Sequence, residues 1–166
     1  MTHGRKPRRY VRISTNPVQL AIRRASRHTD AELASVMGPV RQCLKLVREG
    51  VATQMQFEVL QSTMVIAEAI EASGLVRGLA DHVDSALQAC AAIEARALAR
   101  GTWRQTALYF QELDALATAV DLHEFQLQQL STGELQRIVQ QTMARTSSSG
   151  GNVVRVSEIE LAATAA

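Results

Sequence analysis

Apolar residues recur along the middle of the chain with the three-and-four spacing that is typical of α-helices. Segment 102–129, with the residue that follows it, carries the clearest stripe: Tyr109, Leu113, Leu116, Val120, His123, Leu127 and Leu130. Segment 75–100 carries a comparable stripe of Leu79, Val83, Leu87, Cys90, Ile93 and Ala97. Segment 53–73 carries two neighbouring stripes, one of Phe57, Leu60, Met64 and Ala67, the other of Val59, Ile66 and Ile70. The pattern predicts three long helices that pack as antiparallel neighbours through turns of one or two residues.

Start and stop signals divide the chain further. Pairs three residues apart match the capping box, in which two residues satisfy each other's free backbone donors: Asn16–Gln19, Thr29–Glu32, Thr53–Gln56, Thr102–Gln105 and Ser131–Glu134. Helix ends are indicated by Gly50, Gly74 and Gly101. These signals add shorter helices at about 16–27, 29–49 and 131–145. Segment 29–49 is expected to break or kink at Gly38-Pro39, because proline removes a helical hydrogen bond.

The sequence therefore predicts an all-α fold, an antiparallel bundle of three long helices with shorter N- and C-terminal helices. The expected organisation is a basic arm (1–15), a helical domain (16–145) and a flexible Ser/Gly linker and tail (146–166), with a short extended piece at 153–156. Apolar residues make up 46% of the 166 residues and aromatic residues only 4%, so aliphatic side chains must build the core. No apolar run is long enough to cross a membrane.

Two features bear on assembly and location. The second stripe of segment 53–73 needs cover, from segment 29–49 or from a second subunit, and we expect a homodimer. Cys43 and Cys90 are the only cysteines, and both lie within apolar helical patterns. We expect both to be buried free thiols in a reducing, cytoplasmic setting.

Charge is distributed unevenly along the chain. Residues 1–28 contain eight basic residues and no acidic one, whereas the remainder contains ten basic and sixteen acidic residues. A cationic arm can neutralise phosphates and release counterions, which favours nucleic acid without sequence specificity. An acidic protein partner, or a solvated tail, is compatible with the same charges.

The chain lacks the sequence motifs of common catalytic and cofactor sites. It contains no G-x-G-x-x-G, Walker A, H-E-x-x-H or G-x-S-x-G sequence, and no Glu-x-x-His pair at His82 or His123. His123 occupies a seam position, which favours a hydrogen-bonded core histidine. We expect no enzymatic activity, no cofactor and no metal; Trp103 is expected to pack rather than stack on bases.

The first helix is the best candidate for binding. At 100° per residue, Val18, Ala21, Ile22 and Ala25 share one face, which we expect to dock on the body. Three arginines cluster on the opposite face near Leu20 and suit phosphates. The predicted nucleic-acid-binding residues are Arg5, Lys6, Arg8, Arg9, Arg12, Arg23, Arg24 and Arg27.

Three stretches carry a family resemblance: Lys6-Pro7-Arg8-Arg9-Tyr10 running to Asn16-Pro17, then residues 48–75, then residues 112–135. Together they resemble a group of small helical proteins from proteobacterial chromosomes, prophages and plasmids, some of which are described as Fis-family regulators. The resemblance implies a DNA-associated role on a mobile genetic element. The same origin also fits an inhibitor or adaptor of host machinery, such as an anti-defence protein.

These observations lead to two expected functions. The first is a nucleic-acid-associated regulatory or accessory protein, for example in transcription regulation, that contacts phosphates through its arm and first helix. The alternative is a protein-binding adaptor or inhibitor whose arm contacts an acidic partner. No membrane partner is expected.

Overall fold

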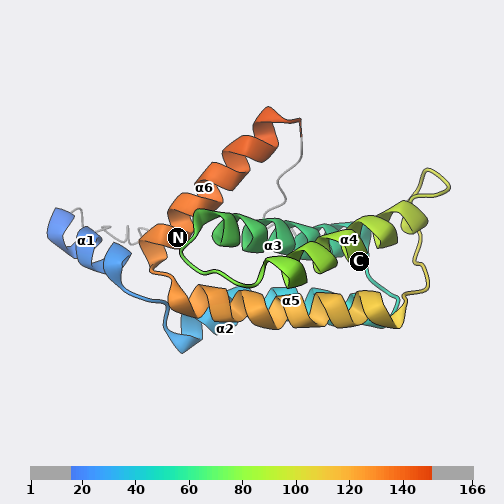
Figure 1. The fold of residues 1–166 in the computed structure, drawn as a ribbon, viewed down its shortest axis with the longest axis horizontal. Coiled ribbons are helices and arrows are strands. Elements are labelled where there is room, and N and C mark those ends of the chain that lie inside the picture. Colours follow the sequence, from blue (N-terminus) through green and yellow to red (C-terminus); the bar gives the residue numbers. More distant parts are fainter. Residues whose placement is uncertain (1–15, 151–166) are drawn as a thin grey trace, which may run out of the picture.

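The computed structural model describes residues 16–150, which form six α-helices and no strand (Figure 1). The helices are α1 (Pro17–Ala25), α2 (Asp30–Arg48), α3 (Gln54–Ser73), α4 (Ala80–Ala97), α5 (Phe110–Gln129) and α6 (Thr132–Ser148). The predicted all-α class is confirmed for this range. The predicted arm at 1–15 and the extended piece at 153–156 lie outside the described residues.

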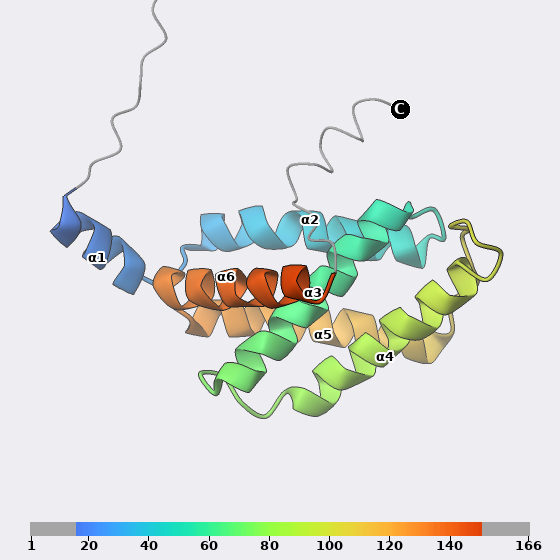
Figure 2. The same cartoon turned by 90° about the horizontal axis from the view of Figure 1, so that it is seen from above.

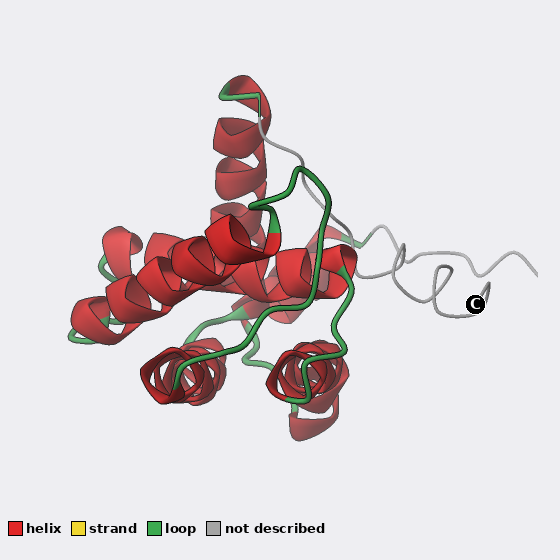
Figure 3. Cartoon of the chain, turned by 90° about the vertical axis from the view of Figure 1, so that its right-hand side faces the viewer, coloured by secondary structure: helices red, strands yellow, loops and turns green. Residues whose placement is uncertain are grey.

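Four helices form the body, and α3 is central to it. Helix α3 contacts α2, α4, α5 and α6, while α4 and α2 also contact α5. Helices α2 and α5 lie in one layer, and α3 and α4 cross above them (Figures 1 and 2). Helix α6 stands on this second layer and rises away from it (Figure 3). Helix α1 contacts α6 and projects beyond the end of the body (Figure 1).

Three of the predicted capping boxes are confirmed. Thr29, Thr53 and Ser131 each accept the backbone N–H of the residue three positions later, whose side chain accepts the cap's own N–H. Asn16 caps α1 through a bond from Val18 N, and Pro17 occupies the first turn. Local sequence therefore fixes these four helix starts.

The predicted start of the fifth helix is wrong, because residues 102–109 are not helical and α5 begins at Phe110. Trp103 packs against Phe57 with ring centroids 5.2 Å apart, and its Nε1 donates to Ala52 O at 3.1 Å. These contacts hold the chain in an extended path across the end of the body. Trp103 is thus a packing residue, as predicted, but it lies on a loop. Helix α5 has 20 residues, about 30 Å at ~1.5 Å per residue.

Helix α4 also starts later than predicted, at Ala80 rather than residue 75. Glu71 Oε1 accepts the N–H groups of Gly78 and Leu79 at 2.7 and 3.3 Å, so segment 74–79 is held as a loop. The connections on either side of α4 are therefore longer than the predicted one- or two-residue turns.

Two further features of the helices differ from the sequence prediction, the break expected at Pro39 and the end of the last helix. Helix α2 runs without interruption through Pro39, because buried residues on both sides of the proline hold one stripe against the body: Leu33, Met37, Val40, Cys43 and Val47. Helix α6 continues to Ser148, so Ser147 and Ser148 are helical rather than part of the predicted linker. Ser148 Oγ donates to Arg145 O at 2.8 Å in this last turn.

The predicted stripes form the core. On α5 the buried residues include Leu116, Val120, His123 and Leu127, whereas Leu113 is only half-buried. Tyr109 is 61% exposed and does not belong to the seam. The first stripe of α3 is buried within the chain, and so are Val59 and Ile70 of the second. Ile66, the remaining residue of the second stripe, is half-buried and lines an open groove beside α6, so helices of the same chain cover this stripe only in part. Cys43 and Cys90 are free and buried, as predicted.

Candidate nucleic-acid interface

Helix α1 is attached to the body mainly through its C-terminal end. Ser26 O, at the C-cap of α1, accepts hydrogen bonds from Thr132 N at 3.0 Å and from Thr132 Oγ1 at 3.2 Å. Arg27 and Ser131 form an isolated antiparallel bridge beside them. Gly133 lies against the Arg24 backbone, where a Cβ would come within 2.9 Å of Arg24 O. The start of α6 therefore holds the end of α1.

The predicted docking of the apolar face of α1 is wrong. Val18 is 64% exposed and Ile22 is 65% exposed, and α1 contains no buried residue. The physical reason is the direction of attachment: the backbone contacts of Ser26 and Arg24 turn the Leu20–Arg24 side toward α6, not the Val18–Ile22 side. The apolar stripe of α1 consequently faces solvent.

The three predicted arginines of this region, Arg23, Arg24 and Arg27, are all exposed. Arg24 lies on one wall of a groove of about 770 Å³ between α1 and α6, and the opposite wall carries Arg137. Other residues that line the groove include Pro17, Leu20, Ala21, Ser131, Gln136 and Gln140. Sequence reasoning missed Arg137, because no local pattern indicates that α6 lies beside α1.

Two carboxylates lie near these arginines, and both are engaged at helix starts. Hydrogen bonds from Ser131 are the main cause of the lowered pKa of Glu134, with further lowering by nearby Arg137 and Arg27. Hydrogen bonds from Thr29 likewise lower the pKa of Glu32, with a smaller effect from His28 and Arg23. Both groups are thus ionised at neutral pH. The groove between α1 and α6 is thus lined by Arg24 and Arg137 together with the ionised Glu134.

The remaining predicted site residues belong to the arm. Arg5, Lys6, Arg8, Arg9 and Arg12 lie outside the described residues, so the structure does not bring them together with the arginines of α1. They precede α1 directly in sequence.

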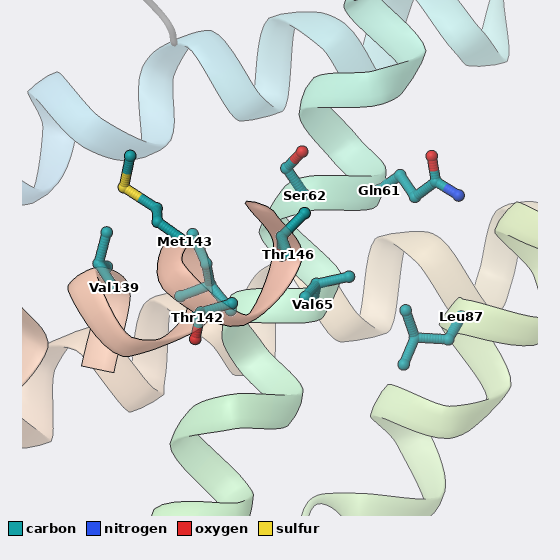
Figure 4. Close-up of a pocket in the computed structure, with 9 residues that line it drawn as sticks. Gln61, Ser62, Val65, Leu87, Val139, Thr142, Met143 and Thr146 are labelled. Carbon is teal, nitrogen blue, oxygen red and sulfur yellow. The ribbon is translucent and has the colours of Figure 1, made fainter. Parts of the chain in front are cut away.

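A second, apolar groove of about 260 Å³ lies where α6 rises from α3 and α4 (Figure 4). Val139 and Met143 of α6 line it together with Val65 of α3 and Leu87 of α4. Gln61, Ser62, Thr142 and Thr146 supply its polar groups. This groove contains no charged side chain and does not match the predicted phosphate chemistry.

The histidine of the seam is a core residue, as predicted. His123 is 4% exposed, and its Nδ1 lies 3.1 Å from Gln126 Oε1. Gln126 Nε2 donates in turn to Ala67 O at 3.1 Å, which links α5 to α3. Burial lowers the pKa of His123, and the hydrogen bond with Gln126 opposes that effect only in part. The ring is neutral at pH 7 and joins two helices.

The other candidate chemical groups are dispersed or buried. Asp81, His82 and Asp84 are exposed near the start of α4. Within residues 16–150, no three His, Cys, Asp or Glu side chains lie close enough together to hold a metal ion. Burial raises the pKa of Cys43 and, together with Glu94, raises the pKa of the Cys90 thiol to about 12. Both thiols are therefore protonated and unreactive at neutral pH.

Comparison of the chain with family models, with curated proteins and with solved structures finds no match. Across the described residues, no helix combines the length and apolar character needed to cross a membrane.

Proposed function

We propose that the chain is a non-enzymatic, nucleic-acid-associated regulatory or accessory protein of a mobile genetic element. It binds the phosphate backbone of the nucleic acid through the basic N-terminal arm and α1. The observation that carries this proposal is the exposure of Arg23 and Arg24 on a projecting helix that contains no acidic residue, and of Arg27 just beyond the end of that helix. Guanidinium groups pair with phosphates through two parallel hydrogen bonds, and no carboxylate on α1 competes with them.

Binding through phosphates makes the affinity depend on salt. Each neutralised phosphate releases counterions, so the affinity falls as the salt concentration rises. For about five neutralised phosphates, the logarithm of the binding constant changes against that of salt with a slope of roughly −4.5. Contacts to phosphate position a protein without reading bases, so this part of the binding is independent of sequence.

The experiment is a fluorescence anisotropy titration of random-sequence DNA and RNA at two salt concentrations. It compares the full chain with a variant in which Arg5, Lys6, Arg8, Arg9 and Arg12 are alanine. The variant is expected to lose most of its binding while keeping the same thermal unfolding transition. No binding by the unaltered chain at low salt, or equal binding by the arm variant, would defeat the proposal.

A protein-binding adaptor or inhibitor, such as an anti-defence protein, is the second candidate. The exposed Val18 and Ile22 favour it, because apolar side chains on a projecting helix suit a protein surface. In this case the basic arm contacts an acidic partner. A pull-down from the native host with and without nuclease separates the two: a partner retained after nuclease treatment supports the adaptor.

Two properties complete the proposal. Because Cys43 and Cys90 are free thiols, we assign the protein to the reducing cytoplasm. A homodimer also stays a prediction, although Val59 and Ile70 of the α3 stripe that motivated it are buried within one chain. Light scattering at micromolar concentration tests it: a mass near that of one 18.1 kDa chain would contradict the dimer.

A further inference from the structure

Helix α1 is exposed along its whole length. Each of its nine residues is exposed, and its contacts with the body lie on the side that faces α6. Ser26 at the C-cap provides the hydrogen-bonded attachment, so the N-terminal turn stands clear of the body (Figures 1 and 2). A convex partner surface can contact only one face of such a helix, whereas a groove can contact several faces at once. It suits a partner with a groove.

We propose that α1 enters the major groove of duplex DNA, an inference that rests on the nucleic-acid function proposed above. The dimensions agree. An α-helix with its side chains is about 10–12 Å across, and nine residues span about 13 Å at ~1.5 Å per residue. The major groove of B-form DNA is about 12 Å wide and about 8.5 Å deep. The double helix of RNA offers no equivalent, because its major groove is too narrow for side chains to read.

The side chains of α1 fit the chemistry of that groove. Arg23 is exposed on one face of α1, and arginine is a side chain that pairs with guanine edges. Val18 and Ile22, both largely exposed, lie on a neighbouring face. In the major groove the methyl groups of thymine offer apolar contact to such residues. Groove insertion therefore accounts for both faces of α1, whereas phosphate contact alone leaves the apolar face without a role.

The start of α6 provides the flanking contact. Arg137 of α6 lies opposite Arg24 in the protein's own groove between α1 and α6, near the junction of α1 with the body. When α1 occupies the major groove of the duplex, Arg137 and Arg27 face the phosphates along the edge of that DNA groove. Glu134 and Glu32 lie near these arginines, but both are bound at helix starts and neither belongs to α1. The inserted helix brings no negative charge toward the DNA.

The test measures the affinity of the full chain for three duplexes of one sequence at one salt concentration. The first is ordinary DNA, the second is DNA in which glucosylated hydroxymethylcytosine fills the major groove, and the third is RNA. We expect at least tenfold weaker binding to the filled duplex and to RNA. Equal affinity for ordinary and filled DNA, or for DNA and RNA, overturns groove insertion and leaves phosphate binding intact. No binding to any of the three overturns the proposed function itself.

A pair of variants keeps the test independent of folding. Arg23→Ala is expected to reduce the preference for ordinary over filled DNA, because it removes a contact made inside the groove. Arg77→Ala removes the same charge from the loop before α4 and is expected to leave that preference unchanged. Since α1 has no buried residue, Arg23→Ala should unfold at the temperature of the unaltered chain. Arg77 is exposed as well, and its Nε donates to Gly74 O at the surface, so Arg77→Ala should change that temperature little. An unchanged preference in Arg23→Ala contradicts the assignment of α1 to the groove.

Discussion

Gly133 of α6 lies against the backbone of Arg24 of α1, so closely that a Cβ on Gly133 would come within 2.9 Å of Arg24 O. Beside this contact, Thr132 N donates to Ser26 O at 3.0 Å. The absence of a side chain at one position thus determines how closely the projecting helix approaches the body. The proposed interface depends on this junction, because it sets the direction in which α1 projects.

Replacement of Gly133 by alanine is expected to loosen α1 without harming the body. Alanine favours helix by about 0.5–1 kcal/mol over glycine, so unfolding of the body is expected to shift little or upward. Exchange of the Thr132 amide hydrogen should accelerate by on the order of tenfold, which corresponds to about 1.4 kcal/mol. Gly38→Ala is the matched control, since Gly38 is helical and has no neighbour within 4 Å of an added Cβ. Equal exchange in both variants would show that the close contact is unimportant.

The ion pair between Arg96 and Glu112 joins the end of α4 to the start of α5. The two guanidinium nitrogens Nη1 and Nη2 lie 2.7 and 2.6 Å from the carboxylate oxygens, and Tyr109 N also donates to Glu112. Glu112→Gln is expected to cost about 1.5–3 kcal/mol of unfolding free energy, the range for hydrogen bonds to charged groups. Glu49→Gln, in the exposed pair with Lys45, is expected to cost under about 1 kcal/mol. Urea unfolding of both variants at pH 7 measures the difference.

The same pair predicts a loss of stability in acid. Burial would raise the pKa of Glu112, but bonds from Arg96 and Tyr109 outweigh it and hold the pKa below 4.5. A carboxyl whose pKa is lowered in the folded state stabilises the fold above its unfolded pKa and loses that effect as the pH falls through the folded one. The difference between the unaltered chain and Glu112→Gln should therefore shrink below about pH 4.5. A constant difference down to pH 3 would count against the ion pair.

His123 adds a second pH dependence at a higher pH. Burial lowers its pKa from 6.5, so the unfolded chain takes up a proton before the folded chain does. The contribution of His123 to the unfolding free energy is therefore fully present above about pH 6.5. It falls by up to about 1.4 kcal/mol per pH unit as the pH drops toward the pKa of the folded state. His123→Gln removes the group that takes up this proton, while His28 and His82 are present in both proteins. Urea unfolding between pH 8 and pH 5 should give a steeper decline for the unaltered chain, and parallel declines would contradict the account.

The core prediction concerns Leu116, which is fully buried on α5. Leu116→Ala is expected to cost about 2–5 kcal/mol, because it removes apolar contacts and leaves a cavity. Leu75→Ala is the control, since Leu75 is half-exposed in the loop before α4 and should cost within about 0.5 kcal/mol. A cost for Leu116→Ala of a few tenths would place the α5 stripe on the surface.

Local signals predicted four helix starts correctly, because a capping box needs only residues within one turn of each other. The same signal failed at Thr102, where Trp103 packs on Phe57, a residue more than forty positions earlier in the chain. The predicted helix start at residue 75 was wrong for a similar reason, since the Glu71 carboxylate holds segment 74–79 as a loop through backbone N–H groups seven and eight residues away. Contacts that are distant in sequence override a local preference without leaving a local pattern.

The candidate interface was predictable in part. Charge and helical spacing indicated Arg23, Arg24 and Arg27, and all three are exposed as a phosphate-binding role requires. The expected docking of Val18 and Ile22 was wrong, because an apolar face predicts burial only when another element lies opposite it. Arg137 was missed because its place beside α1 follows from the junction of Gly133 with Arg24, which only the fold discloses.

The most direct test of the central claim is the affinity of the full chain for a random-sequence DNA duplex at low salt, measured by fluorescence anisotropy. The unaltered chain is compared with Arg23→Ala/Arg24→Ala/Arg27→Ala and with the charge-matched control Arg77→Ala/Arg100→Ala/Arg104→Ala, whose residues are exposed elsewhere. We expect the variant that lacks Arg23, Arg24 and Arg27 to bind at least about tenfold more weakly, a change of about 1.4 kcal/mol, while the control stays within about twofold. Equal weakening in both variants would show that overall charge, and not α1, determines binding, and would contradict the account.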